Sequence, residues 1–161
     1  MLEKLKPDIM VNTLWEVPLE ILKRNEIKGI ILDLDNTLTD WNCLNISEDI
    51  CEWIVSLKKY GFKICIVSNN GAERIEASIK DLDIPYVPNA LKPGKRAFLK
   101  GMKLLGTTPH STAIIGDQLF TDILGGKRLK LTTILVKPRS EKEFIGTKLV
   151  RKIEKAVLSR F

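Results

Sequence analysis

The sequence has no long apolar run. None of its apolar stretches approaches the roughly 18 residues that a membrane-spanning helix needs. The first residues, MLEKLKPDIMVN, lack the uninterrupted apolar core of a signal peptide. We therefore expect a cytoplasmic protein without a transmembrane segment, with peripheral contact with the inner membrane surface as the alternative.

Histidine and cysteine are both scarce. His110 is the single histidine, so any Ser-His-Asp site would depend on it. Because it follows Pro109 at a turn position, a structural role is favoured. The three cysteines, at positions 43, 51 and 65, lack the spacing of a metal site, and their odd number without a secretion signal predicts reduced thiols.

Acidic residues are outnumbered by basic ones. The chain has 26 lysines and arginines against 20 aspartates and glutamates, which gives a formal charge of +6. Such a surplus favours anionic partners, namely phosphates, nucleic acid or an acidic membrane surface, without choosing among them. Hydrophobic residues make up 44% of the chain, which is enough for one domain with a sizeable core.

Apolar strand patterns alternate with amphipathic helix patterns along the chain. Strands are expected at 29–33, 62–68, 84–88, 111–117 and 131–138, and helices at 47–60, 71–82, 94–106 and, briefly, after the fourth strand. This order predicts a single α/β domain over residues 1–161, a Rossmann-like three-layer α/β/α sandwich with a central parallel five-stranded sheet. Residues 1–28 and 139–161 are expected to pack on the sheet as helices.

Four polar clusters follow the expected strands or precede a helix, and they converge on one edge if the sheet is parallel. They are Asp33, Asp35 and Thr37; Ser68, Asn69 and Asn70; Lys92; and Asp117 with Asp122. Each cluster alone would be an ordinary turn, cap or loop. A purely structural explanation does not account for all four clusters occurring together, in this order and at these positions.

The clusters carry acids, a hydroxyl, amides and a lysine, with no base among them. Several carboxylates close together need a cation, and oxygen ligands without imidazole or thiolate suit Mg²⁺. One carboxylate can attack a phosphate group, and a second can protonate the leaving oxygen and later activate water. The hydroxyl, the amides and the lysine can hold the phosphoryl oxygens.

The ordered set DLDNT, SNN, K-P and GDQLFTD resembles the haloacid dehalogenase (HAD) superfamily of phosphohydrolases. The chain is most similar to the YqeG-type subfamily, which includes phosphatidylglycerophosphate phosphatases of mitochondria and plastids. The likeness runs nearly end to end and includes the tail R-K-I-E at 151–154. It implies a HAD-like fold and a phosphatase that depends on Mg²⁺.

The resemblance also implies roles for single residues. Asp33 resembles the nucleophile that takes the phosphoryl group, and Asp35 the general acid/base. Asp33, Asp35 (through its backbone carbonyl) and Asp117 resemble the metal ligands. The remaining matches are Ser68 and the Asn69 amide for phosphate binding, Lys92 bridging nucleophile and phosphate, Thr37 steadying the loop, and Asp122 supporting the site directly or through water.

One departure from the broad superfamily is Gln118, where many members carry a second acid. The loops at 35–47 and 70–83 are too short for an inserted cap domain, so we expect a capless enzyme with an open site. An open site suits a large substrate or a headgroup presented by a membrane better than a small metabolite.

The tail TKLVRKIEKAVLSRF has an apolar face of Leu149, Val150, Ile153 and Val157 surrounded by basic residues. A terminal helix packed on the domain is favoured, and contact with anionic lipid is the alternative. Met10, Leu14 and Trp15 invite the same two interpretations.

Three functions remain open on the sequence. The first is a phosphatidylglycerophosphate phosphatase with an aspartyl-phosphate intermediate, acting in phospholipid biosynthesis. The second is a phosphatase with the same mechanism that acts on a soluble phosphate ester or a phosphoprotein. The third is a non-catalytic scaffold that binds RNA or ribosomes through its basic surface. The complete catalytic set argues against the third, so a phosphorylated substrate is the expected partner and nucleic acid is not.

Overall fold

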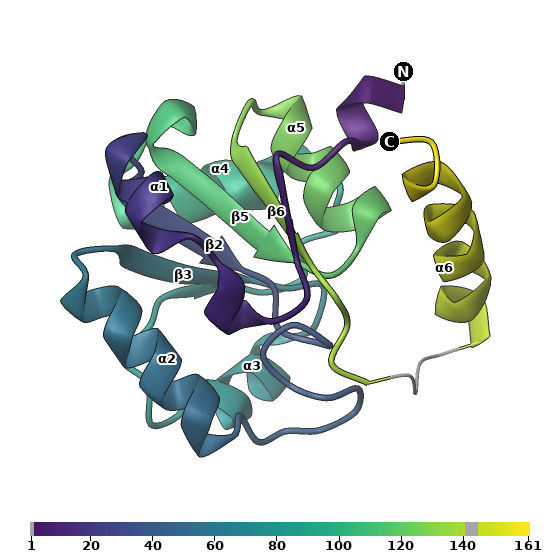
Figure 1. Ribbon diagram of the computed structural model, residues 1–161. Helices are drawn as coiled ribbons and strands as arrows, with labels where there is room; N and C mark the ends of the chain where they lie inside the picture. Colours follow the sequence, from purple (N-terminus) through teal and green to yellow (C-terminus); the bar gives the residue numbers. More distant parts are fainter. Residues whose placement is uncertain (1, 141–144) are drawn as a thin grey trace.

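The computed structural model describes residues 2–140 and 145–161, and a parallel sheet lies at its centre (Figure 1). The sheet has six strands in the order β1-β6-β5-β2-β3-β4. Their bounds are Ile9–Val11 for β1, Gly29–Leu32 for β2, Lys63–Val67 for β3, Tyr86–Val87 for β4, Thr112–Gly116 for β5 and Thr132–Val136 for β6. The predicted three-layer α/β fold with a parallel sheet is therefore confirmed, with one more strand than expected.

The strands β2, β3 and β5 are apolar and buried because both faces of the sheet are covered by helices. One face packs against α1 (Leu19–Arg24), α2 (Glu48–Lys59) and α3 (Ala72–Ile79). The other face packs against α4 (Lys95–Leu105), with α5 (Leu124–Arg128) beside it. Successive residues of β2 alternate between the two layers, Ile30 and Leu32 on one side and Ile31 on the other.

Glycines shape the second helical layer, at the contact of α5 with the core and at the end of α4. A Cβ atom at Gly125 would lie 2.4 Å from the ring of the buried Phe98, and one at Gly126 would lie 2.5 Å from Ile114. These glycines therefore permit the close approach of α5. Helix α4 ends at Gly106, whose φ of 64° is the left-handed conformation that glycine adopts without strain.

The N-terminal segment differs from the prediction that residues 1–28 are helical. Besides the short 3₁₀ turns η1 (Leu2–Leu5) and η2 (Leu14–Glu16) and helix α1, it contributes strand β1, which pairs in parallel with β6 at the sheet edge. The Asp8 carboxylate fixes this pairing by accepting hydrogen bonds from the backbone N–H and the hydroxyl of Thr133, at 2.8 and 2.9 Å. A three-residue strand is too short for its periodicity to be visible in the sequence.

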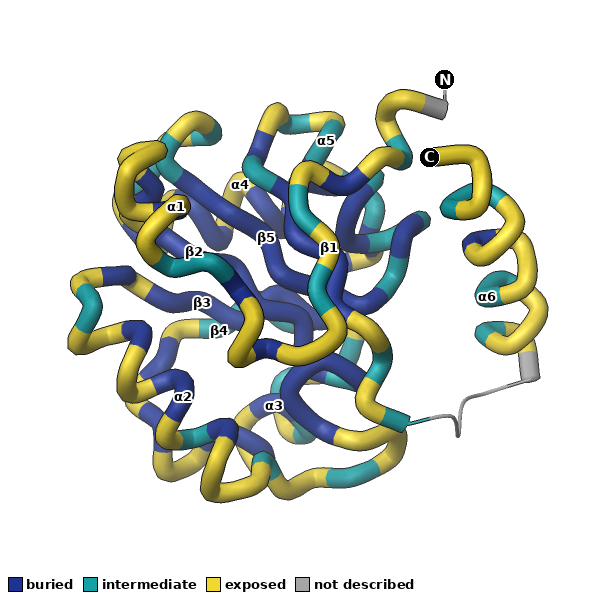
Figure 2. Tube along the Cα trace, viewed as in Figure 1, coloured by how far each residue is buried: buried dark blue, intermediate teal, exposed yellow. Residues whose placement is uncertain are grey.

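The chain closes with η3 (Pro109–Ser111) before β5, a π-helical turn η4 (Leu119–Ile123) after it, and helix α6 (Ile145–Leu158). The predicted C-terminal helical segment 139–161 includes residues 141–144, which lie outside the described residues. Helix α6 packs through Val157 and Leu158 against Leu119, Ile123 and Leu135, and most of its other residues are exposed (Figure 2). Within the described ranges, no helix is both long enough and apolar enough to cross a bilayer.

Candidate active site

The polar clusters converge at the carboxyl ends of β2, β3 and β5. Leu32 at the end of β2 is in register with Ile66 of β3 and with Ile115 of β5. The residues that follow these strands, including Asp33, therefore meet at one edge of the sheet, as the sequence predicted.

Lys92 forms the centre of this arrangement. Its Nζ lies 2.6 Å from Asp33 Oδ1 and 2.6 Å from Asp122 Oδ1, and all three side chains are buried. The backbone N–H of Lys92 donates to Asn69 Oδ1 at 2.8 Å, which anchors the lysine loop to the loop after β3. The attraction of the two carboxylates outweighs the cost of burial and raises the pKa of Lys92, so this side chain is a permanent cation.

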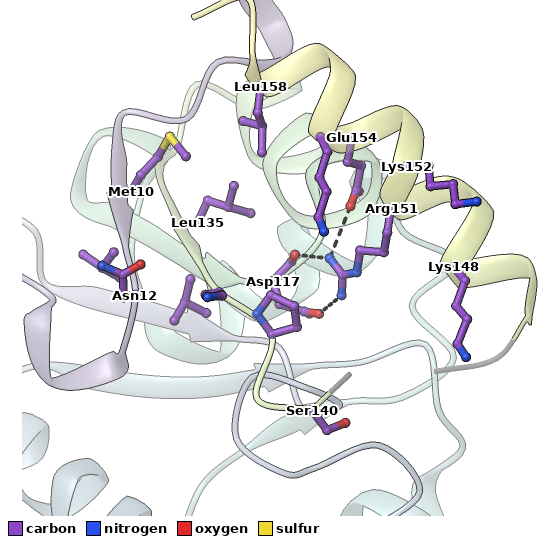
Figure 3. A pocket seen from close by; sticks show the side chains of 15 residues that line it. Met10, Asn12, Asp117, Leu135, Ser140, Lys148, Arg151, Lys152, Glu154 and Leu158 are labelled. Atoms are coloured by element: carbon purple, nitrogen blue, oxygen red, sulfur yellow. Dashed lines mark hydrogen bonds and ion pairs between the residues drawn. The ribbon is translucent and has the colours of Figure 1, made fainter. Parts of the chain in front are cut away.

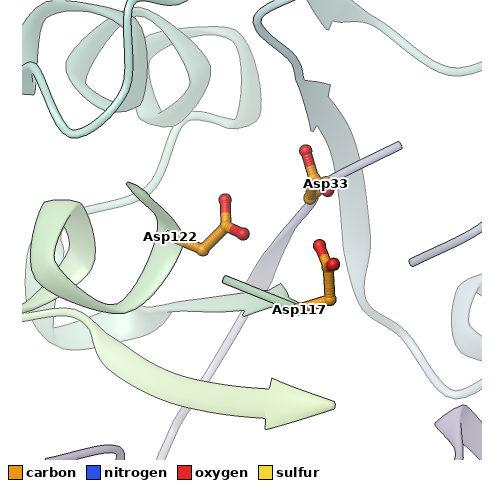
Figure 4. A group of neighbouring side chains, drawn as sticks. All are labelled: Asp33, Asp117 and Asp122. Atoms are coloured by element: carbon orange, nitrogen blue, oxygen red, sulfur yellow. The ribbon is translucent and has the colours of Figure 1, made fainter. Parts of the chain in front are cut away.

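Asp33, Asp117 and Asp122 form an acidic cluster (Figure 4). One carboxylate oxygen from each lies within 4.8 Å of the other two. Thr37 joins two of them, since its Oγ1 is 3.2 Å from both Asp33 Oδ2 and Asp117 Oδ1. Thr37 thereby connects the loop after β2 with the one after β5.

Burial dominates the acidity of this cluster. It raises the pKa of Asp117 well above its usual range, an effect that the charge of Asp33 reinforces and the Arg151 guanidinium opposes. It also raises the pKa of Asp122 to about 6, with the Lys92 ammonium acting in the opposite direction. Crowding and burial therefore disfavour the charged forms of Asp117 and Asp122, and a small divalent cation would relieve this cost because the cluster offers it an all-oxygen donor set.

Asp122 reaches this cluster because residue 116 is glycine. A Cβ atom at Gly116 would lie 2.3 Å from Asp122 Cγ, so any side chain there would displace the carboxylate. Asp122 Oδ2 also accepts a hydrogen bond from the Gln118 backbone N–H at 3.2 Å. The structure thus places a carboxylate oxygen of Asp122 within 4.8 Å of one from Asp33, with Lys92 in contact with both residues.

The side chain of Asp35 is not part of the acidic cluster and has other partners. Its Oδ1 lies 2.6 Å from the Arg74 guanidinium, and its Oδ2 accepts a hydrogen bond from the Asn70 amide. This carboxylate is 30% exposed, whereas Asp33 is buried. Arg74 has no role in the sequence interpretation, and helical position alone would not have shown that it reaches Asp35.

The loop after β3 is folded around Ser68. The Ser68 hydroxyl oxygen accepts hydrogen bonds at 3.2 Å from both the backbone and the side-chain nitrogen of Asn70. The side chain of Asn70 therefore ties Ser68 to Asp35, and that of Asn69 ties the loop to Lys92. Both residues are in the SNN cluster that the sequence singled out.

Helix α6 supplies two residues that the sequence interpretation left without a role. The Arg151 guanidinium donates to both the carboxylate and the backbone carbonyl of Asp117. The buried Glu154 carboxylate accepts from the backbone N–H groups of Leu119 and Phe120, at 2.7 and 3.2 Å. The tail motif R-K-I-E was the available signal, because it contains both residues, but their partners lie about 35 positions away.

The sequence belongs to a recognised family. A family model described as mitochondrial PGP phosphatase matches residues 2–138. The chain belongs to this family. Among the relatives of this chain, the "Probable phosphatase YqeG" of Bacillus subtilis is 38% identical, and the match covers 95% of this chain and 89% of the relative.

Two further comparisons are more distant. "Phosphatidylglycerophosphate phosphatase 1, chloroplastic/mitochondrial" of Arabidopsis thaliana is 29% identical, over 96% of this chain and 47% of the plant protein. Among solved structures, the cobalt-bound deoxy-D-mannose-octulosonate 8-phosphate phosphatase of Haemophilus influenzae superposes with a TM-score of 0.58 at 20% identity, over 85% of this chain and 90% of that chain. Membership of the family makes this protein a phosphatase and favours an enzyme over an RNA-binding scaffold, and the structural match shows that it shares the fold of that solved phosphatase.

Proposed function

We propose that this phosphatase hydrolyses the terminal phosphomonoester of phosphatidylglycerophosphate in an Mg²⁺-dependent reaction through an aspartyl-phosphate on Asp33. One observation carries the mechanism: a buried carboxylate, Asp33, is held by the Lys92 ammonium at 2.6 Å, and the second acid, two residues away, is partly exposed. The family and its plant relative support the substrate. We also infer that residues 1–161 act as one catalytic unit.

In the first step, an Asp33 carboxylate oxygen attacks phosphorus and forms an acyl-phosphate bond. The ester P–O bond breaks, and Asp35 gives its proton to the leaving alcohol oxygen. Arg74 and Asn70 orient Asp35 for this transfer, since they hold its two oxygens. Lys92, Ser68 and the Asn69 amide offset the charge on the phosphoryl oxygens.

In the second step, Asp35 removes a proton from water, and the oxygen of that water attacks the phosphorus of the acyl phosphate. Inorganic phosphate leaves, and the Asp33 carboxylate is restored. Mg²⁺ would be held by Asp33, Asp117 and the Asp35 carbonyl, with Asp122 in the same cluster, and would neutralise negative charge on the transferred group.

The deciding experiment measures phosphate release from phosphatidylglycerophosphate in mixed micelles, with Mg²⁺ and with EDTA. A soluble aryl phosphate runs in parallel, because the same catalytic residues would also serve the soluble-ester alternative. We expect Mg²⁺-dependent release from the lipid that falls at least about 10³-fold in Asp33→Asn. Asp81→Asn, an exposed carboxylate away from the site, is the matched control. Release from the aryl ester alone would eliminate the lipid assignment and keep the phosphatase.

The intermediate has its own test. Enzyme incubated briefly with substrate labelled in the terminal phosphate and then quenched in acid should carry protein-bound label that hydroxylamine releases, as an acyl phosphate requires. Asp33→Asn should carry none. Label that resists hydroxylamine would contradict the proposed chemistry.

A further inference from the structure

A groove of about 810 Å³ lies between helix α6 and the β1–β6 edge of the sheet (Figure 3). One end of the groove is lined by Asp117, a member of the acidic cluster, and by Arg151, which contacts it. The volume lies within the range of small-molecule sites. The groove therefore adjoins the reaction centre without being part of the chemistry described so far.

The sheet side of this groove is apolar. Met10 and Val11 come from β1, Leu135 and Val136 from β6, and Leu158 closes one end from α6. Met10 is 57% exposed although it lies on a strand, and Figure 3 shows its side chain across from α6. Exposed apolar surface in a concave site favours an apolar ligand group.

The opposite wall is basic. Lys148, Arg151, Lys152 and Lys155 of α6 line this wall, and Lys137, which follows β6, adds a positive charge on the sheet side; two acids also line the groove. Both acids, Asp117 and Glu154, are already paired with Arg151. The lysines therefore leave an excess of positive charge facing an apolar floor.

We propose that this groove binds one molecule of an anionic phospholipid that carries the terminal phosphomonoester. The proposal rests on the proposed function and names where the substrate lies. The glycerol and the first part of the acyl chains would pack on the Met10 and Leu135 side. The lysines of α6 would pair with the internal phosphodiester, and the terminal phosphate would extend past Arg151 to Asp33.

Charge complementarity selects this occupant. A soluble phosphate ester would use the cationic wall and leave the apolar floor in water, whereas an uncharged lipid would use the floor alone. A phospholipid with both an internal phosphodiester and a terminal phosphate satisfies both surfaces. It also uses the position of Asp117, which belongs both to the groove lining and to the acidic cluster.

The test separates a groove from attraction to a membrane surface by using a monomeric lipid. Dihexanoyl phosphatidylglycerophosphate below its micelle concentration, the same headgroup without acyl chains, and an aryl phosphate are compared as substrates. In Lys148→Gln/Lys155→Gln, the kcat/KM ratio of lipid to aryl phosphate should fall at least about tenfold, chiefly through KM. The matched control Lys100→Gln/Lys103→Gln, with two exposed lysines on α4, should keep the ratio.

Met10→Ser tests the floor separately and should reduce the preference for the dihexanoyl lipid over the deacylated headgroup. An unchanged lipid-to-aryl ratio in the α6 variant would overturn the groove proposal, because basic residues that act only by attracting membranes do not affect a monomer. Hydrolysis of the aryl phosphate alone by the unaltered protein would overturn it as well.

A binding measurement keeps this test independent of catalysis. Asp33→Asn protein is titrated calorimetrically with the dihexanoyl lipid, with and without the Lys148→Gln/Lys155→Gln changes. At least about tenfold weaker binding in the combined variant supports the groove even if no substrate is hydrolysed, in which case the proposed function fails alone. Equal binding, or none at all in Asp33→Asn, overturns the groove.

Discussion

Glu154 and Leu119 are 35 positions apart in the chain, yet the Glu154 carboxylate accepts a hydrogen bond of 2.7 Å from the Leu119 backbone N–H. Leu119 is the first residue of η4, the turn that carries Asp122 into the acidic cluster. Arg151, one helical turn before Glu154, contacts Asp117 at the same time. Helix α6 therefore holds the segment that follows β5 at two points.

Replacing Glu154 should loosen this segment. Glu154→Ala leaves the buried N–H of Leu119 without its acceptor, which costs about 1–3 kcal/mol, and we expect Tm to fall by roughly 2–4 °C for each kcal/mol. The kcat should fall as well, because Asp117 and Asp122 lose their support. Calorimetry and phosphate release measure the two effects. Glu154→Gln keeps a hydrogen-bond acceptor, so its Tm and kcat should lie between those of Glu154→Ala and the unaltered protein. Glu52→Ala, a change at an exposed position, should leave both values unchanged. An unaffected Tm would contradict the anchoring role.

Removing Lys92 should leave two buried carboxylates without their cation. Lys92→Met is expected to lower the stability of the metal-free protein at neutral pH by about 3–5 kcal/mol, and to reduce kcat at least about 100-fold because the phosphate loses its lysine. Lys92→Met/Asp122→Asn, which removes one of the repelling charges, should regain part of the stability and none of the activity. Urea unfolding and phosphate release report the two quantities. A double variant no more stable than the single one would show that repulsion is not the cause.

The pH dependence of metal binding follows from the raised pKa values. Burial raises the pKa of Asp122 from 3.8 to about 6. Between pH 3.8 and about 6, Asp122 is therefore protonated in the folded protein and ionised in the unfolded chain. The stability of the metal-free protein should therefore fall as pH rises through this window. Mg²⁺ competes with that proton, so its effect on Tm should be small at about pH 5 and larger at about pH 7.5. Differential scanning calorimetry at the two values tests this, and Asp117→Asn should weaken the Mg²⁺ effect at both. Equal shifts at both pH values would argue against protons and metal sharing these carboxylates.

Because α5 packs closely on the core, replacing Gly125 should destabilise the protein. In Gly125→Ala, the added methyl group would clash with the buried Phe98, 2.4 Å away, and we expect a loss of about 1–3 kcal/mol. Gly71→Ala is the comparison, since a Cβ atom there has nothing within 4 Å, and it should cost at most about 1 kcal/mol. Thermal unfolding of both variants ranks them. Similar losses would mean that the α5 layer can relax.

The sequence predicted the parts of this molecule that depend on local pattern. The strands β2, β3, β5 and β6 are continuous apolar runs, and the acidic residues that follow β2 and β5 mark the edge at which they meet. Strand β1 was not predicted, because three residues carry no periodicity. Its register also depends on a distant contact between Asp8 and Thr133.

Long-range side-chain partners were beyond local pattern. Arg74 and Asn70 meet Asp35 only through the fold, and Glu154 meets Leu119 only because α6 returns to the sheet. Helix α6 shows the same limit. Only part of the expected apolar face packs on the domain: Val157 does, whereas Leu149 and Ile153 are 64% and 51% exposed. The contacts of the buried Glu154 and of Arg151 set the rotation of the helix about its axis.

The bridge from Lys92 to Asp33 and Asp122 also bears on the order of events during maturation. A cluster of carboxylates held together only by metal could not assemble until the ion arrived, as in small domains that are unfolded without zinc. Here a side chain of the protein already supplies a positive charge between two of the three acids. The fold therefore has its own cation to offset the charges of Asp33 and Asp122, and we expect metal-depleted protein to remain folded and to lose activity alone.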